Sequence, residues 1–329
     1  MRQDPPGERP GRLMRVAITG AGGRLGRALL AALEEAPFTG PLGPLAWDLP
    51  DHDLDEPASS DRLVRRDRPD IVVHTAAWTD VDGCAKDPAL ALRRNGAAVG
   101  DLAAACVRAG ADLVYISTNE VFDGLRADGR GYSPGDEPRP VNPYGASKRA
   151  GEVAAQAAYL RRGSIAASVA GVDPPAGPQL AIVRTAWLFG PPGNDFPDKI
   201  LAAAERARAA GEPLRVVGDE IGSPTYAPDL ADAIVELLAG GAYAGLHHVV
   251  NGGIVSRAAW ARAILAAIGV NVPVTEVPLS SWTRPSAVPP WAVLAPTPLP
   301  SGELLRPWEA ALADYLPTLL RGRASTARP

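Results

Sequence analysis

Residues 14–26, with the sequence MRVAITGAGGRLG, decide the fold. The first six residues are a short apolar run, which predicts a buried parallel strand. Three glycines spaced three apart follow, Gly20, Gly23 and Gly26, and residues 24–35 then show the leucine spacing of a helix. A strand, a glycine turn and a helix in this order are typical of the first unit of a doubly wound α/β sheet.

The alternation of strand and helix continues along the first half of the chain. We expect further strands at 44–48, 70–74, 112–117 and 180–185, and helices at 59–68, 88–109 and 144–159. This spacing predicts a parallel sheet covered by helices on both faces, a Rossmann-like doubly wound fold. We therefore assign residues 14–185 to a Rossmann domain.

Beyond residue 185 the alternation loosens. We expect helices at 195–210, 228–238, 256–268 and 307–320 and one strand at 214–217, with a proline-rich segment at 273–300. This pattern suits a smaller, mainly helical C-terminal substrate-binding region at 186–320, one that can interleave with the first domain, better than a second sheet. Residues 1–13 are expected to be a flexible extension, 161–178 a surface loop and 321–329 a tail.

The composition of the 329-residue chain excludes several classes of protein. It is 46% hydrophobic and 21% charged, which is ordinary for a globular protein. No stretch has the ~20 apolar residues that a membrane helix needs. The net charge of −4 provides no basic surface for nucleic acid. Cys84 and Cys106, the two cysteines, form no disulfide framework. We therefore expect a cytoplasmic protein without a nucleic-acid or membrane partner.

The glycine loop predicts a dinucleotide-binding site. Gly20, Gly23 and Gly26 permit a tight turn, close approach of the backbone to a pyrophosphate, and close packing of helix against strand. The helix that begins with Arg24 and Leu25 would present free N–H groups to the phosphates. A plain glycine turn is the alternative, but the position between the first strand and the first helix argues against it.

An acid after the second expected strand bears on the choice of cofactor. Asp48 lies 22 residues beyond Gly26, where a carboxylate accepts hydrogen bonds from ribose hydroxyls and repels a 2′-phosphate. It favours NADH over NADPH, although Arg24 could still engage a phosphate. A turn acid before Pro50 is the alternative reading of Asp48.

Two further segments are expected to line the cofactor. Asp53 and Leu54 lie where an adenine contact could form. Thr75, Ala76 and Ala77 follow the third expected strand, and their small side chains would let the cofactor lie close to the backbone.

Tyr144 and Lys148 are the candidate catalytic pair. Side chains four residues apart project from the same face of a helix. A tyrosine has an unperturbed pKa near ~10, so a neighbouring ammonium group and an oxidised nicotinamide would favour the phenolate and lower that pKa. Only three of the 33 basic residues are lysines, so a lysine at this position indicates a specific need. A surface tyrosine with an incidental lysine is the alternative.

Polar residues also follow the fourth expected strand, at the edge where ligands bind in open α/β sheets. They are Ser117, Thr118, Asn119 and Glu120. A hydroxyl group here could hold the substrate oxygen that Tyr144 protonates, while a simple turn hydroxyl is the alternative.

Five stretches together resemble the extended short-chain dehydrogenase/reductase family over residues 14–320. They are GAGGRLG (20–26), RPDIVVHTAAWTDVD (68–82), ISTNEVFDG (116–124), NPYGASKRAGE (142–152) with IVRTAWLFG (182–190), and GSPTYAPDLA (222–231). The last two in combination are typical of its reductase branch. The resemblance implies NADH- or NADPH-dependent reduction of the C4 carbonyl of a nucleotide-linked 6-deoxy-4-keto-hexose, from dTDP-4-dehydrorhamnose to dTDP-L-rhamnose.

The resemblance also implies roles for single residues. Tyr144 would donate the proton, Lys148 would bind the nicotinamide ribose, and Thr118 would align the carbonyl, with Ser117 beside the cofactor. The positions expected to contact the sugar nucleotide are Val81, Thr118, Asn119, Trp187 and Arg284. A core aromatic is the alternative for Trp187. Asn95 matches a recurrent asparagine of these enzymes, for which a structural role within its helix is equally open.

The chain departs from the family at Asn119-Glu120, where an Asp-Tyr pair is common. Dehydratases of the superfamily have Thr-Asp-Glu, and the amide of Asn119 cannot donate the proton that elimination needs. Arg27-Ala28 offers no side chain that binds a metal, so no metal is expected. The sequence is compatible with a homodimer. Two alternatives stay open: an epimerase or dehydratase with recycled NAD, and a non-catalytic NAD(P)-binding regulatory subunit.

Overall fold

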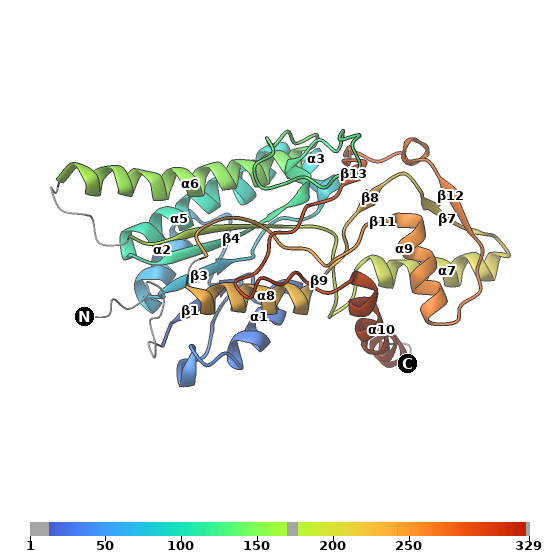
Figure 1. Ribbon diagram of the computed structural model, residues 1–329, viewed down its shortest axis with the longest axis horizontal. Coiled ribbons are helices and arrows are strands. Elements are labelled where there is room, and N and C mark those ends of the chain that lie inside the picture. The colour runs from blue at the N-terminus through green and yellow to red at the C-terminus, as the bar shows by residue number, and fades with distance from the viewer. Residues whose placement is uncertain (1–12, 170–176, 242, 327–329) are drawn as a thin grey trace.

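A six-stranded parallel sheet organises the first half of the molecule (Figure 1). The computed structural model describes residues 13–169, 177–241 and 243–326. Its main sheet has the order β2-β1-β3-β4-β5-β10, with every neighbouring pair parallel. The strands are β1 (Val16–Thr19), β2 (Leu45–Trp47), β3 (Ile71–His74), β4 (Asp112–Thr118), β5 (Leu180–Thr185) and β10 (Gly245–His248). The strand order reverses between β1 and β3, which is where doubly wound sheets bind ligands.

Helices cover both faces of this sheet, so the predicted doubly wound fold is confirmed (Figure 1). One face packs against α1 (Arg24–Glu34) and α8 (Ala227–Gly240), and the other against α2 (Pro57–Asp67), α5 (Ala98–Ala109) and α6 (Pro143–Val169). Successive strand residues alternate between the two cores: Ile18 packs on the α1 side and Ala17 on the α5 side. Burial on both faces explains why these strands are continuous apolar runs.

Several helices differ from the expected bounds. The helix predicted at 88–109 is divided into α4 (Pro88–Leu92), a π-helical turn η2 (Arg93–Ala97) and α5. Helix α6 continues to Val169 instead of ending at Tyr159, so the surface loop predicted at 161–178 is wrong for its first residues. The first prolines after Tyr159 are Pro174 and Pro175, so no proline interrupts the helix between Tyr159 and Val169. Residues 170–176 of that loop, and 1–12 of the predicted extension, lie outside the described residues.

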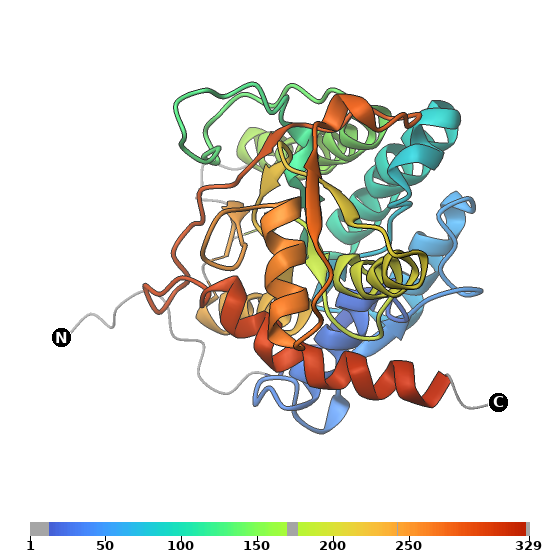
Figure 2. The ribbon, with the colours of Figure 1, turned by 90° about the vertical axis from the view of Figure 1, so that its right-hand side faces the viewer.

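The C-terminal unit combines helices with short strands, and in Figure 2 it faces the viewer. Its helices are α7 (Phe196–Ala210), α9 (Arg257–Ala267) and α10 (Trp308–Thr326), the last of which extends past the predicted end at Leu320. Its strands are β6 (Leu188–Phe189), β7 (Leu214–Val217), β8 (Ile221–Gly222), β9 (Thr225–Tyr226), β11 (Val255–Ser256), β12 (Val274–Val277) and β13 (Trp291–Ala292). They form the small sheets β11-β8-β13, β12-β7 and β6-β9.

Strand pairing connects this unit both internally and to the main sheet. Within the proline-rich segment 273–300, β12 pairs with β7 and β13 with β8. The region also returns to the main sheet, since β10 pairs with β5 and α8 packs against α1. The remaining short elements are η1 (Gly40–Leu42), α3 (Val81–Lys86), η3 (Asn119–Val121) and η4 (Leu279–Ser281).

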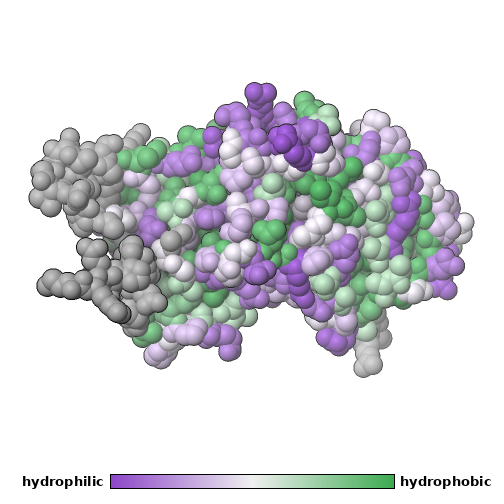
Figure 3. All heavy atoms as spheres, in the orientation of Figure 1, coloured by the Kyte–Doolittle hydropathy of each residue, from purple (hydrophilic) through white to green (hydrophobic). Residues whose placement is uncertain are grey.

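Hydrophilic and hydrophobic residues are interspersed on the face of the molecule shown in Figure 3. Some large apolar side chains are exposed, among them Leu125, Leu160 and Trp282, as is ordinary for protein surfaces. Within the described ranges, the helices are too short or too polar to cross a membrane.

Candidate active site

A cleft of about 790 Å³ lies at the carboxyl ends of β1, β3, β4 and β5, with one wall supplied by the C-terminal unit. It brings together most of the residues predicted from the sequence: Gly20, Gly23, Arg24, Leu25, Asp48, Asp53, Leu54, Thr75, Ala76, Ala77, Val81, Ser117, Thr118, Asn119, Tyr144, Lys148 and Trp187. Gly26 and Arg284 do not line it.

Two glycines of the loop, Gly20 and Gly26, pack too closely against their neighbours to be replaced by a residue with a side chain. Gly20 has φ +64°, and a Cβ atom there would lie 2.8 Å from the Cα of Ala76, which follows β3. A Cβ atom at Gly26 would lie 2.2 Å from the Gly20 carbonyl oxygen. Gly20 therefore allows the ends of β1 and β3 to meet, and Gly26 allows α1 to begin against the loop.

Asp48 closes the cleft at the end of β2. Its Oδ2 accepts a hydrogen bond from the Gly22 N–H at 2.5 Å, and its Oδ1 accepts one from the Leu49 N–H at 2.9 Å. Asp53 and His52 lie on the same wall. Burial lowers the pKa of His52, and the charges of Asp48 and Asp53 oppose this. This wall therefore presents carboxylates and a largely neutral imidazole, a set that suits hydroxyl groups better than phosphate.

Arg24 directs its guanidinium toward the loop 190–195. It donates hydrogen bonds to the carbonyl oxygens of Gly190 and Gly193, the latter at 2.8 Å, and to the Asp195 carboxylate at 3.1 Å. These contacts compete with the phosphate contact expected of Arg24. They also join the first helix of the sheet domain to the start of α7.

The first turn of α6 fixes the catalytic candidates. Asn142 caps the helix, because its Oδ1 accepts a hydrogen bond from the Gly145 N–H at 2.7 Å, and Pro143 occupies the first helical position. Tyr144 and Lys148 then lie on the buried face of the helix, 9% and 3% exposed. Their phenol and ammonium groups both reach the cleft.

The protein's own groups shift the pKa of Tyr144 opposite to the expected direction. Burial and the nearby charge of Glu120 raise it well above the usual value, while a hydrogen bond with the Thr118 side chain opposes the shift. The pKa of Tyr144 was expected to be lowered by the Lys148 cation, but desolvation of the phenolate raises it instead. The phenol is consequently protonated at neutral pH, as a proton donor must be.

Lys148 is held beneath the same part of the cleft. Its Nζ donates a hydrogen bond to the Ile116 carbonyl oxygen at 2.7 Å and lies 4.3 Å from the centre of the Tyr115 ring. Burial lowers the pKa of Lys148 to about 7, while the charge of Glu152 opposes this. An ammonium group has three N–H donors, so contacts besides Ile116 remain available to it.

Ser117 has a structural partner behind the cleft. Its hydroxyl donates to Oε1 of Glu152 at 2.6 Å, and the guanidinium of Arg184 donates to both oxygens of the same carboxylate at 2.8 and 2.7 Å. Burial opposes ionisation, but these hydrogen bonds keep the pKa of Glu152 below its usual value. The network fixes β4 and β5 against α6, and it engages the Ser117 hydroxyl that was expected beside the cofactor.

Asn95 likewise makes structural contacts. Its Oδ1 accepts from the Trp78 N–H at 2.8 Å, and its Nδ2 donates to the Trp78 carbonyl at 2.9 Å and to the Ser147 hydroxyl at 3.1 Å. The side chain thus connects the segment after β3 with α6. Of the two roles considered for Asn95, these contacts favour the structural one.

Trp187 lines the cleft from the C-terminal unit. Its backbone adopts φ +43°, a rare value for a bulky residue. The Arg257 guanidinium lies 3.5 Å from the centre of its ring, and the Trp260 ring stacks at 5.8 Å. Arg257 also pairs with Glu220 at 2.8 Å. The aromatic ring of Trp187 and the cation of Arg257 therefore lie together in the wall that the C-terminal unit contributes to the cleft.

The family model for the RmlD substrate binding domain matches residues 14–321. This chain belongs to that family. The match confirms the predicted membership of the extended short-chain dehydrogenase/reductases, and the RmlD family is the reductase branch to which the sequence motifs pointed.

Individual relatives cover nearly the whole chain. The dTDP-4-dehydrorhamnose reductase of Mycobacterium tuberculosis is 38% identical over 93% of both chains. A crystal structure of a dTDP-4-dehydrorhamnose reductase from Clostridium acetobutylicum is 30% identical, covers 93% of this chain and 100% of its own, and has a TM-score of 0.81. A second, from Bacillus anthracis in complex with NADP, is 33% identical, covers 92% and 98%, and has a TM-score of 0.78.

Arg284 lies outside the cleft of this RmlD-family chain. Its Nε donates to the Asp82 carboxylate at 3.0 Å, and the Ser286 N–H donates to the same oxygen at 3.2 Å. Arg284 therefore links the segment after η4 to α3. Its partner in α3, Asp82, directly follows the cleft residue Val81.

The cleft also contains residues that sequence reasoning missed. They are Leu49, His52, Trp78, Thr79, Arg94, Ile116, Thr185, Ala186, Leu188 and Arg257. Glu120, already named among the polar residues after the fourth strand, also lines the cleft. Six of the missed residues lie inside motifs already quoted, so those motifs were the available signal: Trp78, Thr79, Ile116, Thr185, Ala186 and Leu188. Arg257 lies in no such motif, because it reaches the cleft only through the packing of α9.

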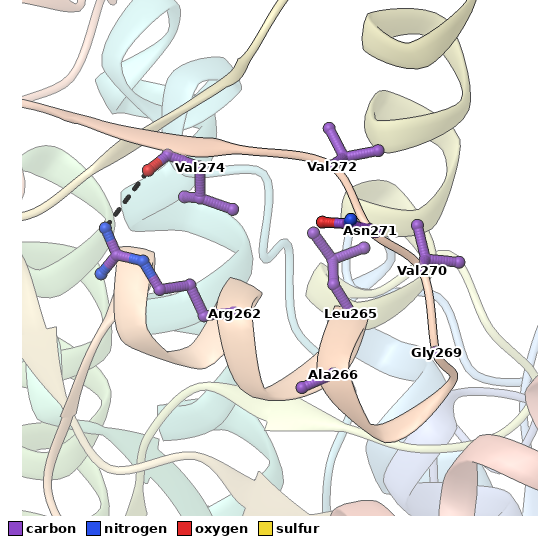
Figure 4. A pocket seen from close by; sticks show the side chains of 8 residues that line it. All are labelled: Arg262, Leu265, Ala266, Gly269, Val270, Asn271, Val272 and Val274. Carbon is purple, nitrogen blue, oxygen red and sulfur yellow. Dashed lines mark hydrogen bonds between the residues drawn. The ribbon is translucent and has the colours of Figure 1, made fainter.

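A second hollow, of about 450 Å³, lies between the end of α9 and β12 (Figure 4). Its lining is mainly aliphatic, and its charged residue, Arg262, donates to the Val274 carbonyl at 3.3 Å and to the Glu276 carboxylate at 2.6 Å. Among the described residues, no cluster of three His, Cys, Asp or Glu could hold a metal. The cleft with Tyr144 is therefore the candidate active site.

Proposed function

We propose that this chain is an NAD(P)H-dependent reductase that converts dTDP-4-dehydrorhamnose to dTDP-L-rhamnose. The observation that carries the proposal is the meeting of Tyr144, Thr118 and Lys148 in the same cleft that the glycine loop lines. Relatives with the name dTDP-4-dehydrorhamnose reductase, matched over nearly the whole chain, support this substrate.

The cleft residues fit a nicotinamide dinucleotide. The close approach at Gly20 leaves the start of α1 free to receive a pyrophosphate. Asp48 and Asp53 suit the hydroxyls of an adenosine ribose. NADH is favoured over NADPH, because a 2′-phosphate would meet these carboxylates while Arg24 is engaged by the loop 190–195. The cofactor supplies the hydride when bound.

Substitution of Asp48 tests this cofactor preference. In Asp48→Ala we expect the ratio of kcat/KM for NADPH to that for NADH to rise about tenfold, because removal of the carboxylate removes repulsion of the 2′-phosphate and a ribose hydrogen bond. Steady-state NADH and NADPH oxidation measures the ratio. Asp53→Ala is a comparison variant from the same wall, and an unchanged ratio in Asp48→Ala would remove Asp48 from this role.

The chain's own residues then perform the proton chemistry. The Thr118 hydroxyl, which hydrogen-bonds the Tyr144 side chain, holds the substrate carbonyl oxygen beside the phenol. Tyr144 donates its proton to that oxygen as negative charge develops on it. Lys148 stabilises the resulting phenolate and holds the nicotinamide ribose with N–H groups not used by Ile116.

The C-terminal wall receives the nucleotide part of the substrate. A nucleotide sugar carries a diphosphate, and Arg257 is a cation facing the cleft beside the aromatic face of Trp187. Its pairing with Glu220 uses Nε and Nη2, which leaves Nη1 for an anionic oxygen. This arrangement orients the sugar toward Tyr144 and the nucleotide toward α9.

The two alternative functions, a dehydratase or epimerase and a non-catalytic regulatory subunit, are less well supported. Asn119 is an amide, so it cannot protonate the hydroxyl that leaves in a dehydratase. Tyr144 and Lys148 are both in place, which favours an enzyme over a regulatory subunit.

Oxidation of NADH and NADPH against a panel of 4-keto-6-deoxy nucleotide sugars tests the function. We expect net oxidation with the dTDP-linked 4-keto sugar and slower turnover with UDP- or GDP-linked analogues. No net oxidation with any member of the panel would contradict the proposal.

A further inference from the structure

Glu120 is a carboxyl group in the cleft that the reduction itself does not use. It follows Thr118 and Asn119 in the turn η3, and its Oε2 accepts a hydrogen bond from the Asn142 Nδ2 at 2.6 Å. In the part of the chain that the structure describes, Oε1 receives no hydrogen bond from another residue. A carboxyl group with one oxygen fixed and the other open to a cleft is ready to accept a hydrogen bond from a ligand.

Asn142 holds Glu120 in a fixed position relative to Tyr144. The Asn142 Oδ1 caps the helix that carries Tyr144, and its Nδ2 donates to Glu120 and also to the Ala287 carbonyl at 2.9 Å. The carboxyl and the phenol line the same cleft, and the Glu120 backbone packs against Gly145, the residue that follows Tyr144. A group next to the reacting carbonyl would therefore face Glu120.

We propose that Glu120 binds the C3 hydroxyl of the 4-keto-6-deoxy-hexose and so selects substrates that carry it. This inference rests on the proposed function, which fixes the C4 carbonyl between Tyr144 and Thr118. The ring neighbours of C4 are C3, which carries a hydroxyl, and C5, which carries a methyl group. A methyl group would desolvate the carboxyl without offering a donor, whereas a hydroxyl donates to it. The subsite thus distinguishes hydroxyl-bearing sugars from 3-deoxy sugars.

The affinities of dTDP-L-rhamnose and of dTDP, each measured by calorimetry with saturating NAD⁺, test this subsite. The first ligand carries the C3 hydroxyl and the second lacks the sugar. In Glu120→Ala we expect the affinity ratio of the two ligands to fall about tenfold with the dTDP affinity unchanged, because one hydrogen bond to a charged group is lost. Glu120→Gln keeps an oxygen for Asn142 and should lower the ratio about threefold, which provides the test if the alanine variant fails to fold.

Glu137→Ala is the matched control, because Glu137 is an exposed carboxylate on the loop between η3 and α6, and both affinities should stay unchanged. A wild-type ratio in Glu120→Ala, or in Glu120→Gln if that variant alone folds, would overturn the inference. So would Glu120-dependent incorporation of solvent deuterium at C3 or C5 of the sugar, which would assign Glu120 to proton abstraction. If the wild-type protein oxidises NADH while the ratio stays unchanged, only this inference fails and the proposed function stands.

Discussion

Burial keeps Tyr144 protonated until a developing alkoxide takes its proton, and the hydrogen bond with Thr118 offsets this effect only in part. In Tyr144→Phe we expect kcat to fall at least about 100-fold, because general acid catalysis typically contributes that much. The affinity for NADH, measured by fluorescence titration, should stay near the wild-type value. Retained turnover in this variant would show that another group donates the proton.

Lys148 offers a second prediction, because burial lowers its pKa to about 7. The ammonium form should predominate below pH 7 and the neutral amine above it, more than three pH units below an ordinary lysine. The chain has only three lysines, so NMR of ¹⁵N/¹³C-labelled lysine side chains can follow each one.

One lysine signal should titrate near pH 7 in the protein without ligands and disappear in Lys148→Met. Lys86 and Lys199 serve as internal references. Titration of all three signals above pH 9.5 would mean that Lys148 remains charged in its buried position.

Residues within one local motif could be predicted from the sequence, and residues brought in by packing could not. Tyr144 and Lys148 were predictable because helical spacing alone gives them a common face. Arg257 was not, because its approach to Trp187 depends on how α9 packs. Ser117 was in the predicted segment, but the partner of its hydroxyl group, Glu152, lies on helix α6, which is distant in the sequence.

At the scale of elements, the start of α6 determines where the catalytic groups lie. Asn142→Ala removes the helix cap, and we expect a loss of about 1 kcal/mol in the free energy of unfolding. We also expect a clear loss of kcat, because the first turn carries Tyr144. Urea unfolding and NADH oxidation measure the two effects.

The matched control is Asp87→Ala, since Asp87 caps α4 through the Leu90 N–H at 2.9 Å and does not line the cleft. It should lose similar stability and keep its turnover. Equal losses of turnover in both variants would mean that stability alone, and not the position of Tyr144, explains the effect of Asn142.

The contrast between local sequence patterns and contacts formed by packing also explains which helices and strands were predictable. Strands β1, β3 and β4 are buried on both faces, so each is an unbroken apolar run that the sequence reveals. Strand β10, with the sequence GLHH, has no such run and is a strand only because it pairs with β5. The short strands β12 and β13 likewise depend on partners far away in the sequence.

At the scale of the whole molecule, the cleft has one wall from each unit. We expect Arg257→Gln to raise KM for the nucleotide sugar at least about tenfold, because a charge-assisted contact to the diphosphate is lost. KM for NADH should change little, since the cofactor lies toward the glycine loop.

Arg262→Gln provides the control from the same helix, because Arg262 pairs with Glu276 outside the cleft. Both Michaelis constants should keep their wild-type values in that variant. A rise in KM for NADH in Arg257→Gln, with no change for the sugar nucleotide, would contradict the proposed orientation of the substrate.

The central claim is that this cleft reduces a sugar carbonyl with net consumption of the cofactor. Reaction of dTDP-4-dehydrorhamnose with NADH deuterated at the transferable position tests it most directly, with the product examined by NMR and mass spectrometry. We predict dTDP-L-rhamnose with one deuterium at C4 and one NADH oxidised for each molecule formed. Conversion of the sugar without net NADH oxidation, or product without deuterium at C4, would contradict the account.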